Sequence, residues 1–169
     1  ETGLSSDPLM NWRLSSLDKY TLISNSDAHS PNRLGREANV FSEELNYQGL
    51  KDVLQNKDTG KFLYTIEFYP EEGKYHYDGH RRCQIRLSPK EARLNNNLCP
   101  VCSRNITVGV LHRVEMLADR PEGFIPENHI PYKNLIPLEE IIAEALGVGR
   151  ETAGVKNEYQ KLCRLFGSE

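Results

Sequence analysis

The stretch from Tyr20 to Pro31 reads Tyr-Thr-Leu-Ile-Ser-Asn-Ser-Asp-Ala-His-Ser-Pro. It opens with a short apolar run and ends in polar residues, with Asp27 and His29 two positions apart. Side chains two positions apart on an extended segment point the same way, so both groups can face one metal-sized space. A carboxylate beside an imidazole suits Zn²⁺, Mn²⁺ or Fe²⁺. At the end of a barrel strand, this pair indicates a catalytic metal site.

The Asp-x-His triplet has a simpler interpretation as well. An Asp that caps a turn, followed by a surface His, would produce the same pattern. Two side chains do not complete a metal site, and the sequence does not obviously contain the remaining ligands of such a cluster. The metal hypothesis therefore depends on ligands supplied from elsewhere.

The chain has 169 residues, which suffices for one compact domain or two small ones. Its hydrophobic content of 38% is low for a self-sufficient core, and its net charge of −3 gives no overall indication of nucleic-acid binding. Between Arg81 and Arg104, however, six of the seven charged residues are basic. Such a cluster is a candidate for phosphate contacts, although a solvated surface explains it equally well.

No apolar run approaches the ~18 residues of a membrane span, and no apolar signal core follows the N-terminus. The sequence begins at Glu1 without a Met, so we expect an internal fragment or a processed product. We expect no membrane partner. The absence of a signal together with the cysteine pattern predicts a cytoplasmic protein.

Periodicity and breaker residues predict a mixture of helices and strands. We expect helices at 9–18, 46–55, 114–118, 137–147 and 151–166. We expect strands at 20–24, 62–69 and 106–111. Four prolines between 119 and 137 predict an extended linker there.

A second constellation has the pattern His80-x₂-Cys83-x₁₅-Cys99-x₂-Cys102. Two pairs of ligands at x₂ spacing, about 15 residues apart, are typical of a structural Zn²⁺ ribbon. Each tight turn aims two donors at one point, and the intervening loop brings the second pair back to complete a tetrahedron. Such a site is closed and non-catalytic.

The three cysteines are the firm part of this pattern, and the fourth ligand is open. His76 or Asp78 lies close enough in sequence to replace His80. Buried reduced cysteines beside an incidental His are the alternative to a metal site. Cys163 lies on an apolar helical stripe, which favours a core position over a ligand.

Five segments together resemble a known family. Two of them, Ser26–Pro31 and Leu34–Asn39, resemble the last metal motif of the polymerase-and-histidinol-phosphatase (PHP) superfamily. Three others narrow the resemblance to the endonuclease Q family of DNA-repair nucleases: Glu72–His80, Cys99–Cys102 and Val108–Val114. The resemblance extends over nearly the whole chain.

The resemblance implies an α/β protein, α+β within this chain. The expected parts are the end of a distorted (β/α)₇ PHP barrel at 1–60, a zinc-ribbon-like domain at 61–118, and a Pro-rich linker with a C-terminal helical hairpin at 119–169. The His-x-His motif and the middle ligands of the family are absent from this sequence. We therefore expect the C-terminal portion of such an enzyme, inactive alone, with the missing N-terminal part as a partner.

Family members nick DNA on the 5′ side of deaminated bases (uracil, hypoxanthine, xanthine) and of abasic sites, so damaged DNA is the implied substrate. Asp27 and His29 match the last pair of catalytic metal ligands, for Zn²⁺, Mn²⁺ or Mg²⁺. The structural zinc ligands matched by the resemblance are Cys83, Cys99 and Cys102, with His80 as their partner.

The candidate DNA contacts are Arg36, Arg81, His112 and Arg113. For each of them, a structural salt bridge or a solvated position is an equal alternative. Tyr75 and Tyr77 can stack on a base, or they can form a miniature core near the zinc. Two other functions stay open: a PHP phosphoesterase acting on a small phosphorylated substrate, and a non-catalytic zinc-ribbon module that binds nucleic acid.

Overall fold

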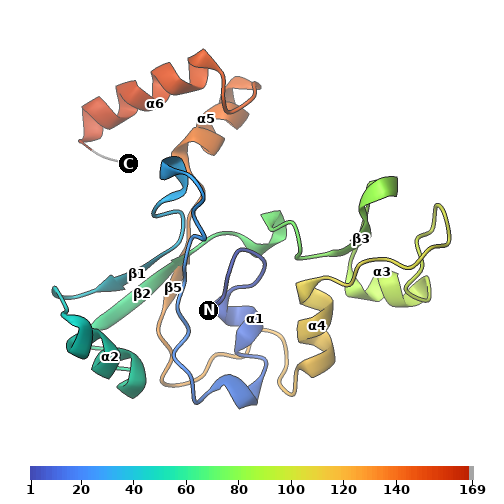
Figure 1. Cartoon of the computed structure of the whole chain (residues 1–169), viewed down its shortest axis with the longest axis horizontal. Coiled ribbons are helices and arrows are strands. Elements are labelled where there is room, and N and C mark those ends of the chain that lie inside the picture. The colour runs from blue at the N-terminus through green and yellow to red at the C-terminus, as the bar shows by residue number, and fades with distance from the viewer. Residues whose placement is uncertain (168–169) are drawn as a thin grey trace. The chain divides into compact units, whose positions relative to one another are not determined.

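The computed structural model describes residues 1–167 and shows a mixed α/β chain with two small sheets (Figure 1). The chain forms two compact units, and the boundary between them in the sequence falls between Asn134 and Leu135. The first unit carries both sheets, and the second consists of two helices. The α/β class expected from the sequence is confirmed at this level. The three-part division into barrel end, zinc domain and hairpin remains a prediction.

The larger sheet has three strands in the order β1-β2-β5. Strand β1 (Ala38–Phe41) pairs with β2 (Phe62–Glu67) in antiparallel fashion, and β2 pairs with β5 (Tyr132–Asn134) in parallel. The β2 prediction is confirmed. β5 lies inside the predicted linker, and the linker prediction is wrong there because a proline-free stretch of three residues can pair with β2.

Helix α2 (Tyr47–Asn56) packs beside this sheet, as the sequence predicts. Its first turn is capped by the Asn46 side chain, whose oxygen accepts a hydrogen bond from the Gly49 N–H. Phe62 is fully buried and forms a core with Val53 of this helix and with Ile130. The segment just before β5 is thus held by the same core.

The strand predicted at 20–24 is wrong for the described residues. Its backbone is satisfied by other groups: the Asn39 carboxamide bonds both the N–H and the C=O of Ser24, at 2.9 and 2.7 Å. The Ile23 carbonyl accepts a hydrogen bond from the Thr2 N–H. The segment is therefore extended but lies in no sheet.

The smaller sheet is a hairpin of β3 (Asp78–His80) and β4 (Ile85–Leu87), followed by helix α3 (Pro89–Leu94). The strand predicted at 106–111 is wrong. Only Thr107 forms a bridge, to Gly79, and helix α4 (Val110–Leu117) begins three residues later. Because α4 takes up the apolar residues from Val110, the β-branched run is too short to extend the sheet.

The helix predicted at 9–18 is broken into helix α1 (Pro8–Asn11) and a 3₁₀ turn at Ser15–Leu17. The Asp119 carboxylate accepts hydrogen bonds from both the N–H and the hydroxyl of Ser15. This contact replaces a helical hydrogen bond, so the helix ends early. Further 3₁₀ turns lie at Pro31–Arg33, Pro70–Glu72 and Arg81–Cys83.

The second unit is the predicted helical hairpin. Helices α5 (Leu138–Leu146) and α6 (Ala153–Phe166) bury Ile142, Ala143 and Val155 between them. Gly147 ends α5 with a φ of 66°, a left-handed conformation that favours glycine. Among the described residues, none of the helices combines the length and apolar character needed to cross a bilayer.

Two buried carboxyl groups lie at the ends of β1 and β2. Glu67 accepts hydrogen bonds from the hydroxyls of Thr2 (2.8 Å) and Thr65 (2.6 Å). Burial raises the pKa of Glu67, although these two hydrogen bonds act to lower it. Glu37 is 4% exposed, with its Oε1 accepting from the Phe68 N–H and its Oε2 unpaired among the described groups. Burial, with a smaller contribution from the negative charge of Glu67, raises the pKa of Glu37 to about 7.

The Glu37 carboxyl predicts a pH-dependent stability. Since the folded state binds this proton more tightly than the unfolded state, its stabilising contribution is complete below pH 4.5 and is lost as the pH rises through about 7. Glu37→Gln, which keeps the acceptor and cannot ionise, should make the free energy of unfolding decline less over this range. Denaturant unfolding at a series of pH values measures this difference.

Glu44→Gln is the matched control, because Glu44 is exposed and precedes α2. Its pH profile should follow that of the wild type. A Glu37→Gln profile parallel to the wild type would show that Glu37 ionises equally in both states.

Candidate metal centres and nucleic-acid interface

The structure brings His80, Cys83, Cys99 and Cys102 together at one point. One donor atom of each residue lies within 4.8 Å of the donors of the other three, and the Cys102 sulfur is 3.3 Å from His80 Nδ1. His80 ends β3 and Cys83 ends the 3₁₀ turn that follows. The second pair lies in a tight turn, where the Cys99 carbonyl accepts a hydrogen bond from the Ser103 N–H.

This donor set fits a tetrahedral metal ion. Zn²⁺ bound at about 2.3 Å to sulfur holds its ligands roughly 3.8 Å apart, which is compatible with the spacing observed here. Desolvation and hydrogen bonds with the two other thiols raise the pKa of Cys83 to about 11. Desolvation also opposes ionisation of Cys99, but N–H groups of Val101 and Cys102 outweigh it and lower its pKa to about 6. The cluster thus provides a thiolate that can receive a cation such as zinc.

The two alternative fourth ligands point elsewhere. His76 is buried, with its Nδ1 3.0 Å from the Ser5 carbonyl. Asp78 is buried and accepts hydrogen bonds through both oxygens, from the Gly109 N–H and from His112. Neither belongs to the group of four donors. The geometry therefore favours His80 as the fourth ligand.

His112, a predicted DNA contact, is buried on α4. Its Nδ1 lies 2.6 Å from the Asp78 carboxylate, and the side chain is 6% exposed. This interior imidazole, held by a buried carboxylate, joins α4 to β3. The position of His112 therefore indicates a structural role.

Asp27 and His29 lie together on an exposed loop, with side chains 78% and 85% exposed. His29 Nδ1 is 2.8 Å from the Asp27 carbonyl, an arrangement in which Nδ1–H donates and Nε2 keeps its lone pair. Asp27 adopts a φ of 44°, so the chain turns sharply between the two residues. The pair fits two ligands of a metal site, and the described residues supply no third ligand beside it.

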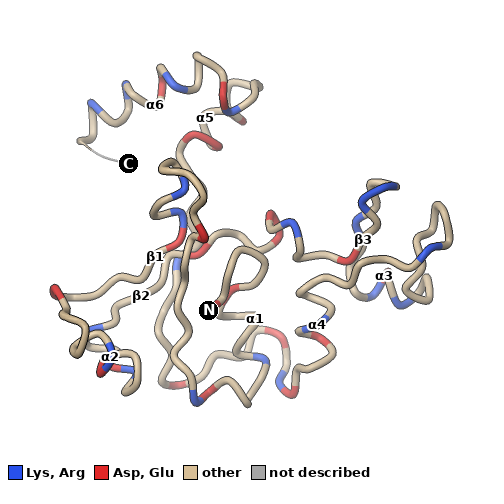
Figure 2. Tube along the Cα trace, viewed as in Figure 1, with Lys and Arg blue, Asp and Glu red and all other residues tan. Residues whose placement is uncertain are grey.

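The predicted arginines differ in their surroundings. Arg36 is partly buried, donates to the Ser26 carbonyl at 2.8 Å and lies over the Phe68 ring, so it fastens the loop that carries Asp27. Arg81 and Arg113 are exposed, and neither forms an ion pair with another described residue. Figure 2 shows that several Lys and Arg residues lie after β3 and along α3. This surface is the best candidate for phosphate contacts.

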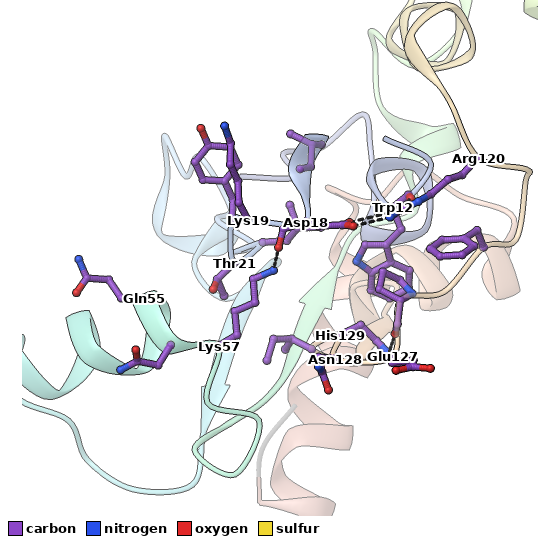
Figure 3. Close-up of a pocket in the computed structure, with 17 residues that line it drawn as sticks. Trp12, Asp18, Lys19, Thr21, Gln55, Lys57, Arg120, Glu127, Asn128 and His129 are labelled. Carbon is purple, nitrogen blue, oxygen red and sulfur yellow. Dashed lines mark hydrogen bonds and ion pairs between the residues drawn. The ribbon is translucent and has the colours of Figure 1, made fainter. Parts of the chain in front are cut away.

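A pocket of about 540 Å³ lies on another side of the first unit (Figure 3). Its charges largely neutralise one another. The Asp18 carboxylate accepts from Arg120 at 2.7 Å, and the Asp18 carbonyl accepts from Lys57. The pocket is assembled from residues 12–22, 55–57 and 120–130, and no local sequence pattern indicates it. Its cations are engaged within the chain, which distinguishes it from the surface after β3.

The chain is similar to several known proteins. The family model described as "MJ0043 C-terminal domain" matches residues 137–169. The whole chain is 35% identical to the uncharacterized protein MJ0043 of Methanocaldococcus jannaschii and covers 22% of it. It is 30% identical to the uncharacterized protein YqxK of Bacillus subtilis and covers 40% of it. The chain thus spans less than half the length of these relatives.

Two solved structures share the fold. The lesion-specific endonuclease PfuEndoQ of Pyrococcus furiosus matches 98% of this chain with a TM-score of 0.81 and 33% identity. Endonuclease Q in complex with a 27-mer duplex bearing an abasic lesion matches 99% with a TM-score of 0.84 and 34% identity. In both cases the chain covers 42% of the solved protein.

Over nearly its whole length, the chain is similar in fold and sequence to part of a lesion-specific endonuclease. That endonuclease is endonuclease Q, and the resemblance predicted from the sequence is confirmed over nearly the whole chain.

Removing one thiol tests the Cys/His centre. Cys99→Ser should lose most of the bound zinc. Its zinc affinity should fall more than 10–100-fold, because a loss of that size already follows when a group that only supports a metal ligand is removed. Cys163→Ser is the matched control, because Cys163 lies on α6 outside the cluster. Elemental analysis of both purified variants measures zinc per chain. Equal zinc content in the two variants would contradict the assignment.

Proposed function

We propose that this chain is the C-terminal portion of a metal-dependent DNA-repair endonuclease. The observation that carries the proposal is the match of 98–99% of the chain to endonuclease Q structures, one of them solved on a duplex with an abasic lesion. At 33–34% identity, this match extends beyond the general fold. The proposed substrate is damaged DNA, nicked on the 5′ side of a deaminated base or an abasic site.

In this proposal residues 1–60 complete a PHP barrel whose other strands lie in the N-terminal part of the full-length protein. The extended segment 20–24 supports this arrangement. It is extended, but within the described residues its backbone bonds the Asn39 side-chain amide and the Thr2 N–H in place of a neighbouring strand. Residues 61–118 form the zinc-binding domain, and 119–169 contribute the linker and the helical hairpin.

Asp27 and His29 have a defined task in this scheme. Divalent ions at such a site supply hydroxide near neutral pH and offset the charge of the transition state. The residues themselves provide a carboxylate oxygen and an imidazole Nε2 on one exposed loop. The Asp27 carbonyl fixes the orientation of the His29 ring, and Arg36 holds the adjacent Ser26 carbonyl.

The Cys/His centre has a structural task. With four protein donors and no open position, it would hold β3, the following turn and the Cys99–Cys102 turn in one arrangement. This arrangement presents Arg81 at the surface, where it can contact phosphate. Free thiols also favour a reducing compartment, in keeping with the cytoplasmic location expected from the sequence.

Substitution of Asp27 in the full-length protein tests the catalytic assignment. Asp27→Asn should reduce nicking by a factor on the order of 100 or more, because an amide binds a divalent cation poorly and even supporting groups cost 10–100-fold. The substrate is a duplex with a single uracil, hypoxanthine or abasic site, incubated with Mn²⁺ or Mg²⁺. Gel separation of the nicked strand gives the rate and the position of the cut.

Asp52→Asn is the control, because Asp52 is an exposed carboxylate on α2 that bonds only the neighbouring Gln48 side chain. It should nick at the wild-type rate. Release of phosphate from p-nitrophenyl phosphate without nicking would favour a small-molecule phosphoesterase. DNA binding without either reaction would favour a non-catalytic module. Full nicking activity of Asp27→Asn would contradict a catalytic role of this residue.

A further inference from the structure

A groove of about 400 Å³ lies beside the Cys/His centre, between the β3-β4 hairpin and the segment that leads into α4. Its lining includes both aromatic and basic side chains: Lys74, Tyr75, Tyr77, Arg81 and Arg86. His80, one of the four clustered donors, lies at the same groove. The groove thus joins Arg81, already a candidate phosphate contact, to two tyrosines and two further cations.

The groove is positively charged. Lys74, Arg81 and Arg86 are exposed, and none of them forms an ion pair with another residue of the described range 1–167. The one acidic residue in the lining, Asp78, is buried and holds the Gly109 N–H and His112. Three cations therefore face the groove without a compensating carboxylate. An anionic ligand is indicated.

Two tyrosine rings accompany these charges. The Lys74 ammonium lies 5.2 Å from the centre of the Tyr75 ring, and the Arg86 guanidinium lies 5.0 Å from that of Tyr77. Tyr75 is 61% exposed although it is a large aromatic residue. Exposed rings beside cations can stack on planar bases while the cations meet phosphates. The indicated ligand thus has both flat rings and negative charge.

The groove walls are held firmly. The N–H and C=O of Gly79 both bond Thr107, at 3.0 and 2.7 Å. A Cβ at Gly79 would lie 2.4 Å from the Ile85 carbonyl, and one at Gly109 would lie 2.4 Å from the Tyr77 backbone. Both walls therefore approach each other as closely as glycine allows. A preformed groove binds a flexible strand at lower entropic cost.

We propose that this groove binds an unpaired stretch of the DNA strand near the lesion. Bases inside an intact duplex stack on one another and offer no free face, whereas an unpaired nucleotide offers its face to Tyr75 and its phosphate to Arg81 or Arg86. The inference rests on the proposed function for its ligand class. It adds that this groove binds unpaired nucleotides in preference to an intact duplex.

Fluorescence anisotropy with a labelled short oligothymidylate tests the groove in the full-length protein, without added catalytic cations. Tyr75→Ala should weaken binding roughly ten-fold, since one stacked base is lost, while Tyr75→Phe should bind as the wild type does. Arg86→Gln should weaken binding and reduce the dependence on salt by about one phosphate contact. The wild type should prefer the oligothymidylate to an intact duplex of equal length.

The matched control is Tyr20→Ala. Tyr20 is also an exposed tyrosine beside a lysine, with Lys19 Nζ 5.1 Å from its ring, but it lies at the other pocket. It should bind the oligothymidylate as the wild type does. Zinc content, measured on every variant, confirms that the neighbouring centre is intact.

The outcomes separate this inference from the proposed function. If the wild type nicks a lesion duplex while Tyr75→Ala retains full affinity for the oligothymidylate, the groove assignment is overturned and the endonuclease stands. An equal loss in Tyr20→Ala also overturns the groove assignment. If the wild type nicks no lesion but its affinity depends on Tyr75, the groove is supported and the endonuclease activity is overturned.

Discussion

In the first unit, the arrangement of the Cys/His centre and of the groove beside it depends on the hydrogen bonds of the buried Asp78 carboxylate. One oxygen accepts from the Gly109 N–H and the other from His112, both at 2.6 Å, so β3 is joined to the start of α4. His80 lies two residues later on β3 and belongs to the cluster with the three thiols. The same contact brings Thr107–Gly109 against the hairpin and forms the proposed groove. A carboxylate without these partners would be costly to bury.

The two candidate metal centres differ in how far this chain completes them. The Cys/His centre has four donors from one short region, so the hairpin and a single turn suffice to assemble it. Asp27 and His29 are exposed on a loop, and the chain spans 42% of the endonuclease Q structures that it matches. A proposal for catalysis therefore concerns the full-length protein. The groove and the Cys/His centre can be studied as properties of this chain's own residues.

Several elements were predictable from local patterns, and others were not. Helix α2, strand β2 and the α5-α6 hairpin follow from periodicity with clear caps or breakers. The prediction at 20–24 failed because strand formation depends on a neighbouring strand, which a local pattern does not reveal. The prediction at 106–111 failed because helix α4 already begins at Val110. β5 was missed because prolines surround it. His112 looked available for DNA in sequence, whereas its partner Asp78 lies 34 residues away.

The sequence by itself determined the three cysteines of the candidate metal centre, since x₂ spacing in a tight turn brings two donors close together. It also determined the resemblance to endonuclease Q. Only the tertiary structure favours His80 as the fourth donor, because His76 and Asp78 find partners in Ser5 and α4. It alone decided that Tyr75, Tyr77 and three cations share one groove. Such choices depend on contacts between distant segments, and these form only when the chain folds.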